Sequence, residues 1–207
     1  MCGIFGIYLK KINKSHKNID EDIKILSQLS RVRGQDTFGL LISTNNKEKI
    51  FKINADPSEV SKRKDYKNFI KSTFEAINEI TPLSIIGQTR LVTNGTKFLP
   101  ENNQPIITDN IIGVHNGIIV QDQKDAESLV KSNNEGYNVK SDSLKFFEDL
   151  SKIFSKDSNQ FIDNYFKYIN NIDGNYSIAF RVPSLKLNFL SSNCGSLHFS
   201  KTEENLL

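Results

Sequence analysis

The sequence lacks the features that mark membrane, secreted and disulfide-rich proteins. Its 207 residues include only two cysteines, Cys2 and Cys194, which are too few for a disulfide framework. No hydrophobic run approaches the length of a membrane span. The first apolar run is short and its lysines follow it, the wrong order for a signal peptide, and no N-terminal glycine is placed for myristoylation. We therefore expect a protein of the reducing cytoplasm, without membrane attachment.

Signatures of several common ligands are also missing. The three histidines, His16, His115 and His198, share no metal-ligand spacing with the two cysteines, so we expect no metal. No G-x-x-x-x-G-K-[ST] loop is present, so nothing indicates ATP, and we expect no cofactor. The net charge is +3, and the lysines are scattered instead of alternating with aromatic residues along one stripe. This pattern argues against a nucleic-acid partner.

What the sequence contains is typical of one globular domain, which we predict over residues 1–207. Its hydrophobic content is 37% and its charged content is 25%, with no internal repeat and no low-complexity linker. Apolar runs rich in β-forming residues predict strands at 2–9, 38–44, 49–53, 84–89, 111–115, 175–182, 186–191 and 196–200. Apolar residues that recur every three or four positions predict helices at 20–32, 57–79, 124–132, 142–155 and 158–171.

The order of these elements predicts an α+β fold. Strands come in groups with helices between the groups, and the last three predicted strands are joined by short turns at 183–184 and 193–195. Such a meander is antiparallel, which argues against a doubly wound parallel sheet. The last residues of the chain resemble the start of a further strand.

Cys2 stands at an unusual place, directly after Met1 in "MCGIFGIYLKK". A terminal residue without a role is the ordinary interpretation, but the segment is apolar and rich in β-formers, so it is expected to pack. Once Met1 is removed, the α-amino group of Cys2 has a reference pKa of about 7.7–8.0 and can take the thiol proton. An N-terminal cysteine therefore carries its own base for attack on an amide carbon.

Three further stretches gather polar residues at strand ends: "RVRGQDTFGL", "GQTRLVTNGT" and "GVHNGII". Taken singly they are a helix C-cap, a rim charge and a hairpin turn. Together with Cys2 they fit amide hydrolysis. The Asn116 amide and the Gly117 backbone N–H can meet an oxyanion, Arg90 can bind a carboxylate, and Asp142 in "VKSDSL" can bind an ammonium group.

These stretches resemble the class II glutamine amidotransferases, which carry N-terminal-nucleophile glutaminase domains. The resemblance runs through the whole chain in order, as "MCGIFGI", "RGQDTFGL", "IIGQTRLVTNG", "NNQPI", "VHNGII", "SDSL" and "DGNYSIAF". It implies a four-layer αββα sandwich of two antiparallel sheets. It also implies hydrolysis of L-glutamine to glutamate and ammonia through a γ-glutamyl thioester, with the ammonia passing to a synthase domain or subunit outside these residues.

The resemblance implies a role for each matching residue. Cys2 is the nucleophile, and Asn116 with Gly117 forms the oxyanion hole. Arg90 holds the α-carboxylate of glutamine and Asp142 its α-ammonium group. The remaining matches are Thr93, which helps to position the substrate, and Arg33, Gly34 and Asp36, which shape the pocket.

Some alternatives stay open on sequence grounds. "QTRL" stands where relatives often have His-Thr-Arg-Trp, and "RGQDT" replaces RGPDS or RGYDS, so the subfamily is undecided. Another N-terminal-nucleophile amidase or acylase, a non-catalytic glutamine-binding regulatory domain and a structural α+β module are the competing hypotheses. A homo-oligomer is compatible with the sequence.

Overall fold

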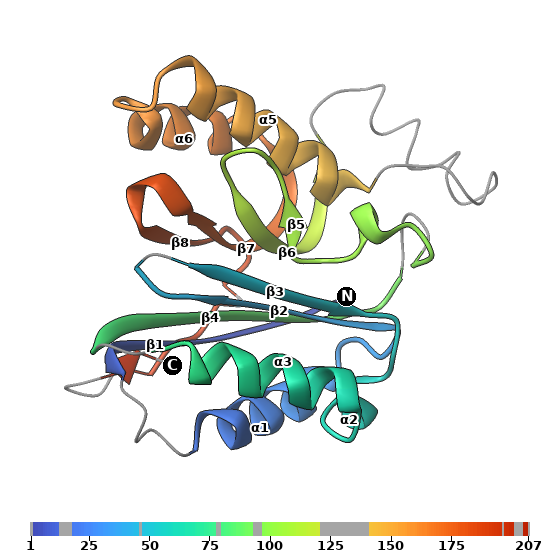
Figure 1. Ribbon diagram of the computed structural model, residues 1–207. Coiled ribbons are helices and arrows are strands. Elements are labelled where there is room, and N and C mark those ends of the chain that lie inside the picture. Colours follow the sequence, from blue (N-terminus) through green and yellow to red (C-terminus); the bar gives the residue numbers. More distant parts are fainter. Residues whose placement is uncertain are drawn as a thin grey trace. The chain divides into compact units, whose positions relative to one another are not determined.

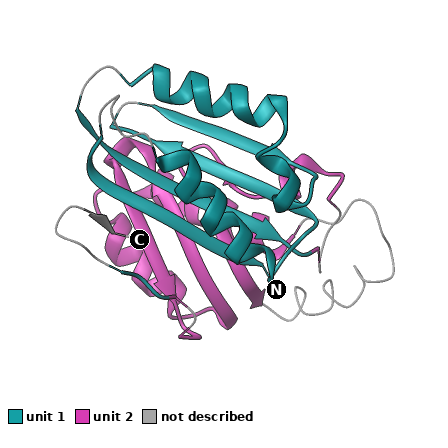
Figure 2. Ribbon diagram, turned by 90° about the horizontal axis from the view of Figure 1, so that it is seen from below, with its two compact units in different colours: residues 1–91, 198–207 teal, residues 92–197 magenta. Residues whose placement is uncertain are grey.

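The computed structural model describes residues 2–12, 18–45, 47–77, 80–92, 97–120, 141–195 and 197–200, together with the backbone of 205–206 (Figure 1). The chain divides into two compact units (Figure 2). The first unit comprises Met1–Leu91 and His198–Leu207, and the second comprises Val92–Leu197. Each unit holds one antiparallel sheet and a hydrophobic core of its own.

The sheet of the first unit has the strand order β3-β2-β4-β1-β9. Its strands are β1 (Gly3–Ile12), β2 (Thr37–Ser43), β3 (Glu48–Ile53), β4 (Thr81–Arg90) and β9 (Asn205–Leu206). The central strand β4 pairs Thr89 with Gly3 of β1 and Arg90 with Thr37 of β2. This register brings the start of β1, the start of β2 and the end of β4 to the same end of the sheet.

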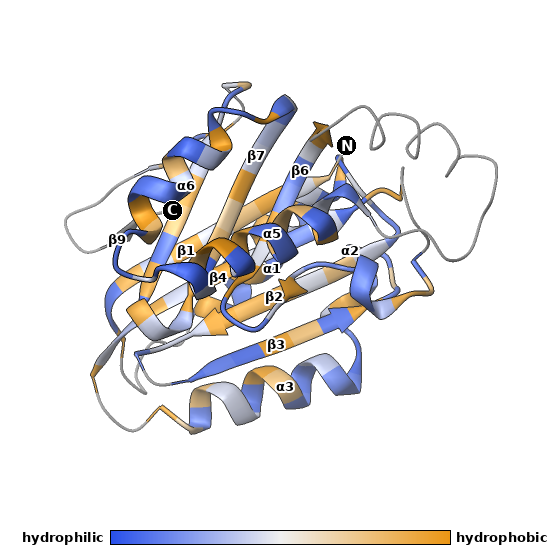
Figure 3. Cartoon of the chain, turned by 90° about the horizontal axis from the view of Figure 1, so that it is seen from above, coloured by the Kyte–Doolittle hydropathy of each residue, from blue (hydrophilic) through white to orange (hydrophobic). Residues whose placement is uncertain are grey.

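Helices α1 (Ile19–Arg31), α2 (Pro57–Val60) and α3 (Lys64–Glu75) pack against one face of that sheet (Figure 1). Every second residue of β2, namely Phe38, Leu40 and Ile42, is buried in the core that they cover. This follows from the period of two of a β-strand. Figure 3 shows the matching pattern in hydropathy, with β1 and β4 largely hydrophobic and α3 of mixed character.

The sheet of the second unit has the order β5-β6-β7-β8. Its strands are β5 (Ile106–Ile107), β6 (Ile112–Val120), β7 (Asp173–Val182) and β8 (Leu187–Ser192), with α5 (Asp142–Lys156) and α6 (Phe161–Ile169) on one face. The core is aromatic. Phe180 and Phe189 are cross-strand partners whose rings stack with centroids 4.7 Å apart, and Phe147 meets Phe180 edge to face.

The structure corrects the predicted helix 57–79, which is two helices, α2 and α3. In the continuous helix, Val60 and Tyr66 would lie on different faces, because six residues make about one and two-thirds turns. The break between the helices allows both side chains to be buried in the same core. The predicted helix 124–132 lies outside the described residues.

One predicted strand is too short, and another is absent from the described part of the chain. The strand predicted at 111–115 continues to Val120, because its polar residues stay in the ladder with β7. The strand predicted at 196–200 is absent from the described residues 197–200, so the last three strands form no meander. The chain instead adds β9 beside β1, in the sheet of the first unit. The predicted α+β class with two antiparallel sheets is confirmed.

Candidate active site

Cys2 lies directly before β1, beside the end of β4. Its Sγ is 3.8 Å from the carbonyl oxygen of Leu91, the distance of a weak S–H···O contact, and the residue is half-buried. The pairing of Gly3 with Thr89 in β4 fixes this position. The N-terminal cysteine is therefore held by the sheet and is not a frayed chain end.

The "RGQDT" stretch is fastened to the same end of β4. The backbone N–H of Asp36 donates to the carbonyl oxygen of Arg90 at 2.9 Å. Gly34 lies so close to this strand that a Cβ would stand 2.4 Å from the carbonyl carbon of Arg90, so only glycine fits without a shift. The first unit thus brings Cys2, Arg90, Gly34 and Asp36 to the same end of β4, and their roles stay predictions.

The other predicted residues of this unit differ in their setting. Arg90 is buried, with 4% of its surface exposed, whereas Arg33 is exposed. Asp36 is half-buried. Thr93 belongs to the second unit and lies outside the described residues, so its predicted role as a positioning residue remains a prediction.

In the second unit, Asn116 and Gly117 lie within β6 and do not form a hairpin turn. Asn116 pairs with Ser177 and Gly117 pairs with Tyr176 in an uninterrupted register with β7. Gly117 has φ +139°, and a Cβ there would lie 1.8 Å from the carbonyl oxygen of Asn175. Only glycine can occupy this position, because the backbone conformation and the space both exclude a side chain.

The alternation of the β-ladder decides where the Gly117 N–H points. Tyr176, its partner, directs both backbone groups to Asn193: its N–H donates to Oδ1 at 2.8 Å and its carbonyl accepts from the Asn193 N–H at 3.2 Å. Gly117 and Tyr176 are therefore a non-hydrogen-bonded pair of the ladder. The Gly117 N–H consequently points away from β7, toward the opposite edge of β6.

On that edge, the backbone N–H groups two residues before and two residues after Gly117 donate to side chains. The N–H of His115 donates to Oε1 of Gln104, and the N–H of Ile119 donates to Oδ2 of Asp142 at 3.0 Å. Strand β5 does not extend this far, since it pairs only with Ile112 and Gly113. Gly117 thus lies between His115 and Ile119, whose N–H groups are both bonded to side chains. Its own N–H is directed to a part of the edge that no strand among the described residues covers.

Two polar side chains, Gln104 and Ser143, are buried next to His115. The imidazole Nδ1 is 2.8 Å from Oγ of Ser143, and Gln104 Nε2 donates to the His115 carbonyl at 3.1 Å. Burial lowers the pKa of His115, with the negative charge of Asp142 opposing the shift, so the imidazole is neutral at neutral pH. Sequence reasoning missed Gln104, Ser143 and Asn193 as parts of this site, although the polar run "NNQP" before β5 was a signal for the first.

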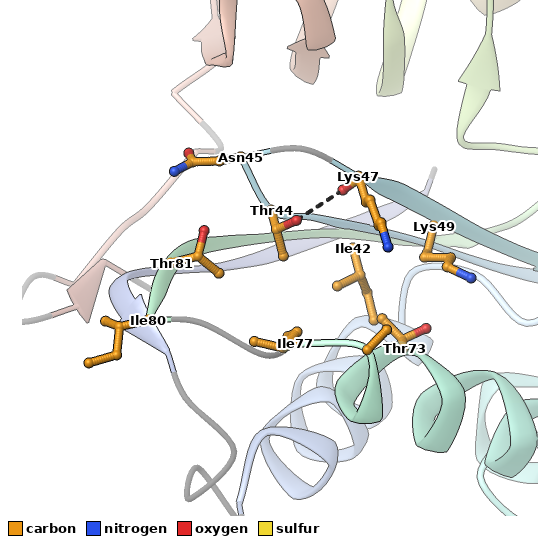
Figure 4. A pocket seen from close by; sticks show the side chains of 10 residues that line it. Ile42, Thr44, Asn45, Lys47, Lys49, Thr73, Ile77, Ile80 and Thr81 are labelled. Carbon is orange, nitrogen blue, oxygen red and sulfur yellow. Dashed lines mark hydrogen bonds between the residues drawn. The ribbon is translucent and has the colours of Figure 1, made fainter.

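The predicted site residues divide between the two units. Cys2 and Arg90 belong to the first unit, and Asn116, Gly117 and Asp142 belong to the second. The first unit also holds a cavity of about 370 Å³ near the end of β2, and its lining includes Ile42, Thr73 and Ile77 (Figure 4). No predicted site residue lines this cavity.

None of the helices in the described part of the chain is long and apolar enough to cross a membrane.

Comparison with known proteins gives one sequence relative and matching solved folds. No protein-family model matches the chain. The glutamine–fructose-6-phosphate aminotransferase (isomerizing) of Buchnera aphidicola subsp. Acyrthosiphon pisum is 28% identical in an alignment of 215 positions that covers 100% of this chain. The alignment covers 31% of that relative, so the chain spans about a third of its length.

Two solved structures share the fold at 16% sequence identity. They are the glutamine phosphoribosylpyrophosphate amidotransferase of B. subtilis, with a TM-score of 0.61, and the allosteric regulatory enzyme of purine biosynthesis, with a TM-score of 0.62. Each match covers 99% of this chain and 41% of the solved chain. In sequence the chain is thus similar to a glutamine–fructose-6-phosphate aminotransferase, and in fold it is similar to amidotransferase structures. The resemblance that its ordered motifs indicated is confirmed at this level.

Proposed function

We propose that the chain hydrolyses L-glutamine to glutamate and ammonia, and that the ammonia passes to a synthase domain or partner subunit. The observation that carries the proposal is the edge of β6, where the Gly117 N–H points outward. It lies between His115 and Ile119, whose N–H groups are bonded to side chains. A fixed backbone N–H beside a side-chain amide, here that of Asn116, suits an oxyanion. In this proposal the two units form one glutaminase domain, because both supply residues.

The proposed reaction follows from the residue types. The α-amino group of Cys2 takes the thiol proton, and the sulfur attacks the side-chain amide carbon of glutamine. Asn116 and the Gly117 N–H stabilise the oxyanion that forms. The proton passes to the amide nitrogen, the C–N bond breaks, and ammonia leaves a γ-glutamyl thioester. Water then cleaves the thioester, which releases glutamate and restores Cys2.

The substrate's amino-acid group is assigned to two charged side chains. Arg90 binds the α-carboxylate and Asp142 binds the α-ammonium group, as charge complementarity requires. Arg33, Gly34, Asp36 and Thr93 support the pocket. Both cysteines are outside disulfides, which fits the proposed reducing cytoplasm. The named activity of the sequence relative, a glutamine-dependent aminotransferase, supports the choice of glutamine.

Intact mass measured before and after treatment with 6-diazo-5-oxo-norleucine tests this function. We expect a chain without Met1 that gains one adduct, mapped to Cys2. The Cys2→Ala variant should gain no adduct and show no glutaminase activity. The Cys194→Ala variant is the matched control, because it removes the other cysteine and should behave like the wild type.

Other outcomes separate the competing hypotheses. A chain without Met1 that binds glutamine but forms no adduct would indicate a regulatory binding domain. Turnover of acyl amides without turnover of glutamine would indicate another amidase of this fold. Normal glutamine turnover in the Cys2→Ala variant would overturn the assignment of the nucleophile.

A further inference from the structure

Gln104 occupies the position at which the pairing of β5 with β6 would continue. The register pairs Ile107 with Ile112 and Ile106 with Gly113. Backbone groups of alternate residues point to the same side of a strand, so two residues further on the same side the register would pair residues 104 and 115. The backbone makes no strand pair there. Instead, the Gln104 side-chain amide accepts from the His115 N–H through Oε1 and donates to the His115 carbonyl through Nε2 at 3.1 Å. One side chain therefore replaces one step of the β-ladder.

Ser143 and the imidazole of His115 complete this connection. Nε2 of Gln104 is 3.3 Å from Oγ of Ser143, which in turn is 2.8 Å from Nδ1 of His115. The Ser143 hydroxyl therefore links the Gln104 amide to the imidazole of His115. All three residues are at most 5% exposed. The connection is thus a buried polar network next to Asn116.

We propose that Gln104 is a positioning residue for glutamine hydrolysis, an inference that rests on the proposed function. It holds the His115 backbone, and through it the Asn116 amide and the Gly117 N–H, in the geometry that an oxyanion needs. Gln104 itself makes its hydrogen bonds to His115 and Ser143 and takes no part in the bond-breaking steps. Its effect passes through one peptide bond to Asn116 and two to Gly117.

The expected kinetic signature follows from when the oxyanion exists. The negative oxygen forms only as the amide is attacked, so a misplaced donor weakens the transition state more than the bound substrate. Displacing a catalytic group by about 1 Å can cost roughly 100-fold in rate. Loss of the Gln104 amide should therefore lower kcat while KM for glutamine changes little.

The test compares variants of the whole chain in a glutaminase assay. Gln104→Met keeps the approximate side-chain shape and removes both bonds to His115, so kcat should fall by roughly 10- to 100-fold. Ser143→Ala keeps those two bonds, so its kcat should fall less than that of Gln104→Met. Gln104→Glu is the second variant in case Gln104→Met does not fold. It keeps an acceptor for the His115 N–H and loses the donor, so an intermediate loss of kcat is expected.

Asn110→Ala is the matched control for stability. Asn110 is another side-chain amide of this unit, and its bonds go to Ser151 and Ser155 of α5, away from Asn116. This variant should lose thermal stability and keep its kcat. A Gln104→Met variant with normal kcat, or with a loss no larger than that of an equally destabilised Asn110→Ala, would overturn the inference.

The wild-type measurement separates this inference from the proposed function. A wild-type chain that turns over no glutamine contradicts both. A wild-type chain that turns over glutamine, together with a Gln104→Met variant that does so equally well, contradicts the positioning role alone. A rise in KM with unchanged kcat would also contradict it, since that result describes substrate binding.

Discussion

Oδ2 of Asp142 accepts a hydrogen bond from the backbone N–H of Ile119, at 3.0 Å. Asp142 is the first residue of α5, and the preceding Ser141 caps the helix by accepting from the Leu144 N–H at 3.2 Å. The carboxylate is therefore fixed at a helix N-terminus, where the helix dipole favours negative charge. It also ties α5 to β6 two residues beyond Gly117, so the residue proposed to bind ammonium has a structural contact as well.

The two roles of Asp142 can be separated by substitution. Asp142→Asn keeps an oxygen that can accept from the Ile119 N–H and removes the charge, so the fold should keep most of its stability. Losing one hydrogen bond to a charged group costs about 1.5–3 kcal/mol, which corresponds to roughly a 10- to 150-fold rise in KM for glutamine. Steady-state kinetics and a thermal melt of the same preparation measure both effects.

Asp142→Ala is the companion variant, because it removes the charge and the bond to Ile119 together. It should show the same rise in KM and an additional loss of melting temperature. If Asp142→Asn instead kept the wild-type KM, the assignment of Asp142 to the ammonium group would be wrong, and its contact with Ile119 would be its whole role.

Gly117→Ala should destabilise the second unit strongly. The φ of +139° is unfavourable for any other residue and the new Cβ would meet the Asn175 carbonyl, so we expect a loss of about 3 kcal/mol or more in unfolding free energy. Gly195→Ala is the control. Gly195 has φ +66° with open space around it, so only the backbone cost of about 1–2 kcal/mol applies. Urea unfolding that gives equal losses for both would contradict the crowding at Gly117.

Much of the fold was predictable because its core is strongly periodic. In α5, Leu144, Phe147, Leu150 and Phe154 recur every three or four residues, and all four are buried. The errors arose where one signal was ambiguous. His115 and Asn116 interrupt an apolar strand in sequence, yet β6 continues through them because their backbone groups are still paired.

Candidate site residues could be named from the sequence for a related reason, and their roles stay predictions. Cys2, Arg90 and Gly117 belong to ordered motifs, so their resemblance to a family was visible in the sequence. The two hydrogen bonds from the Gln104 amide to the His115 backbone were not visible, because they depend on a side chain that replaces a strand partner. The polar run "NNQP" drew attention to Gln104, but a local sequence pattern does not show that its side chain bonds to the backbone of His115.

Arg31 and Asp56 form a two-point ion pair that joins the end of α1 to the start of α2. Arg31 Nε lies 2.6 Å from Oδ1 and Nη2 lies 2.7 Å from Oδ2 of Asp56. The same carboxylate caps α2 by accepting from the Ser58 N–H at 2.9 Å. The Arg31 guanidinium, with help from Ser58, holds the pKa of Asp56 well below its usual range. Arg31 lies shortly before the "RGQDT" stretch in sequence, so the pair fixes the end of α1 just ahead of that stretch.

This lowered pKa predicts how the stability of the first unit depends on pH. In the unfolded chain Asp56 titrates near its usual value of about 3.9, and in the folded chain at a lower pH. The contribution of the carboxylate is therefore complete above the unfolded pKa and is lost as pH falls toward the folded pKa.

Asp56→Asn keeps an acceptor for the Ser58 N–H and removes the charge. Its melting temperature should lie below that of the wild type at pH 7, and the gap should narrow below about pH 4. Because Arg31 is partly exposed, added salt should also narrow the gap. Thermal melts from pH 7 to pH 3, with Lys62→Gln as a control for loss of an exposed ion pair, measure this dependence. A gap that stayed constant over that range would show that the charge of Asp56 contributes nothing to the stability of the fold.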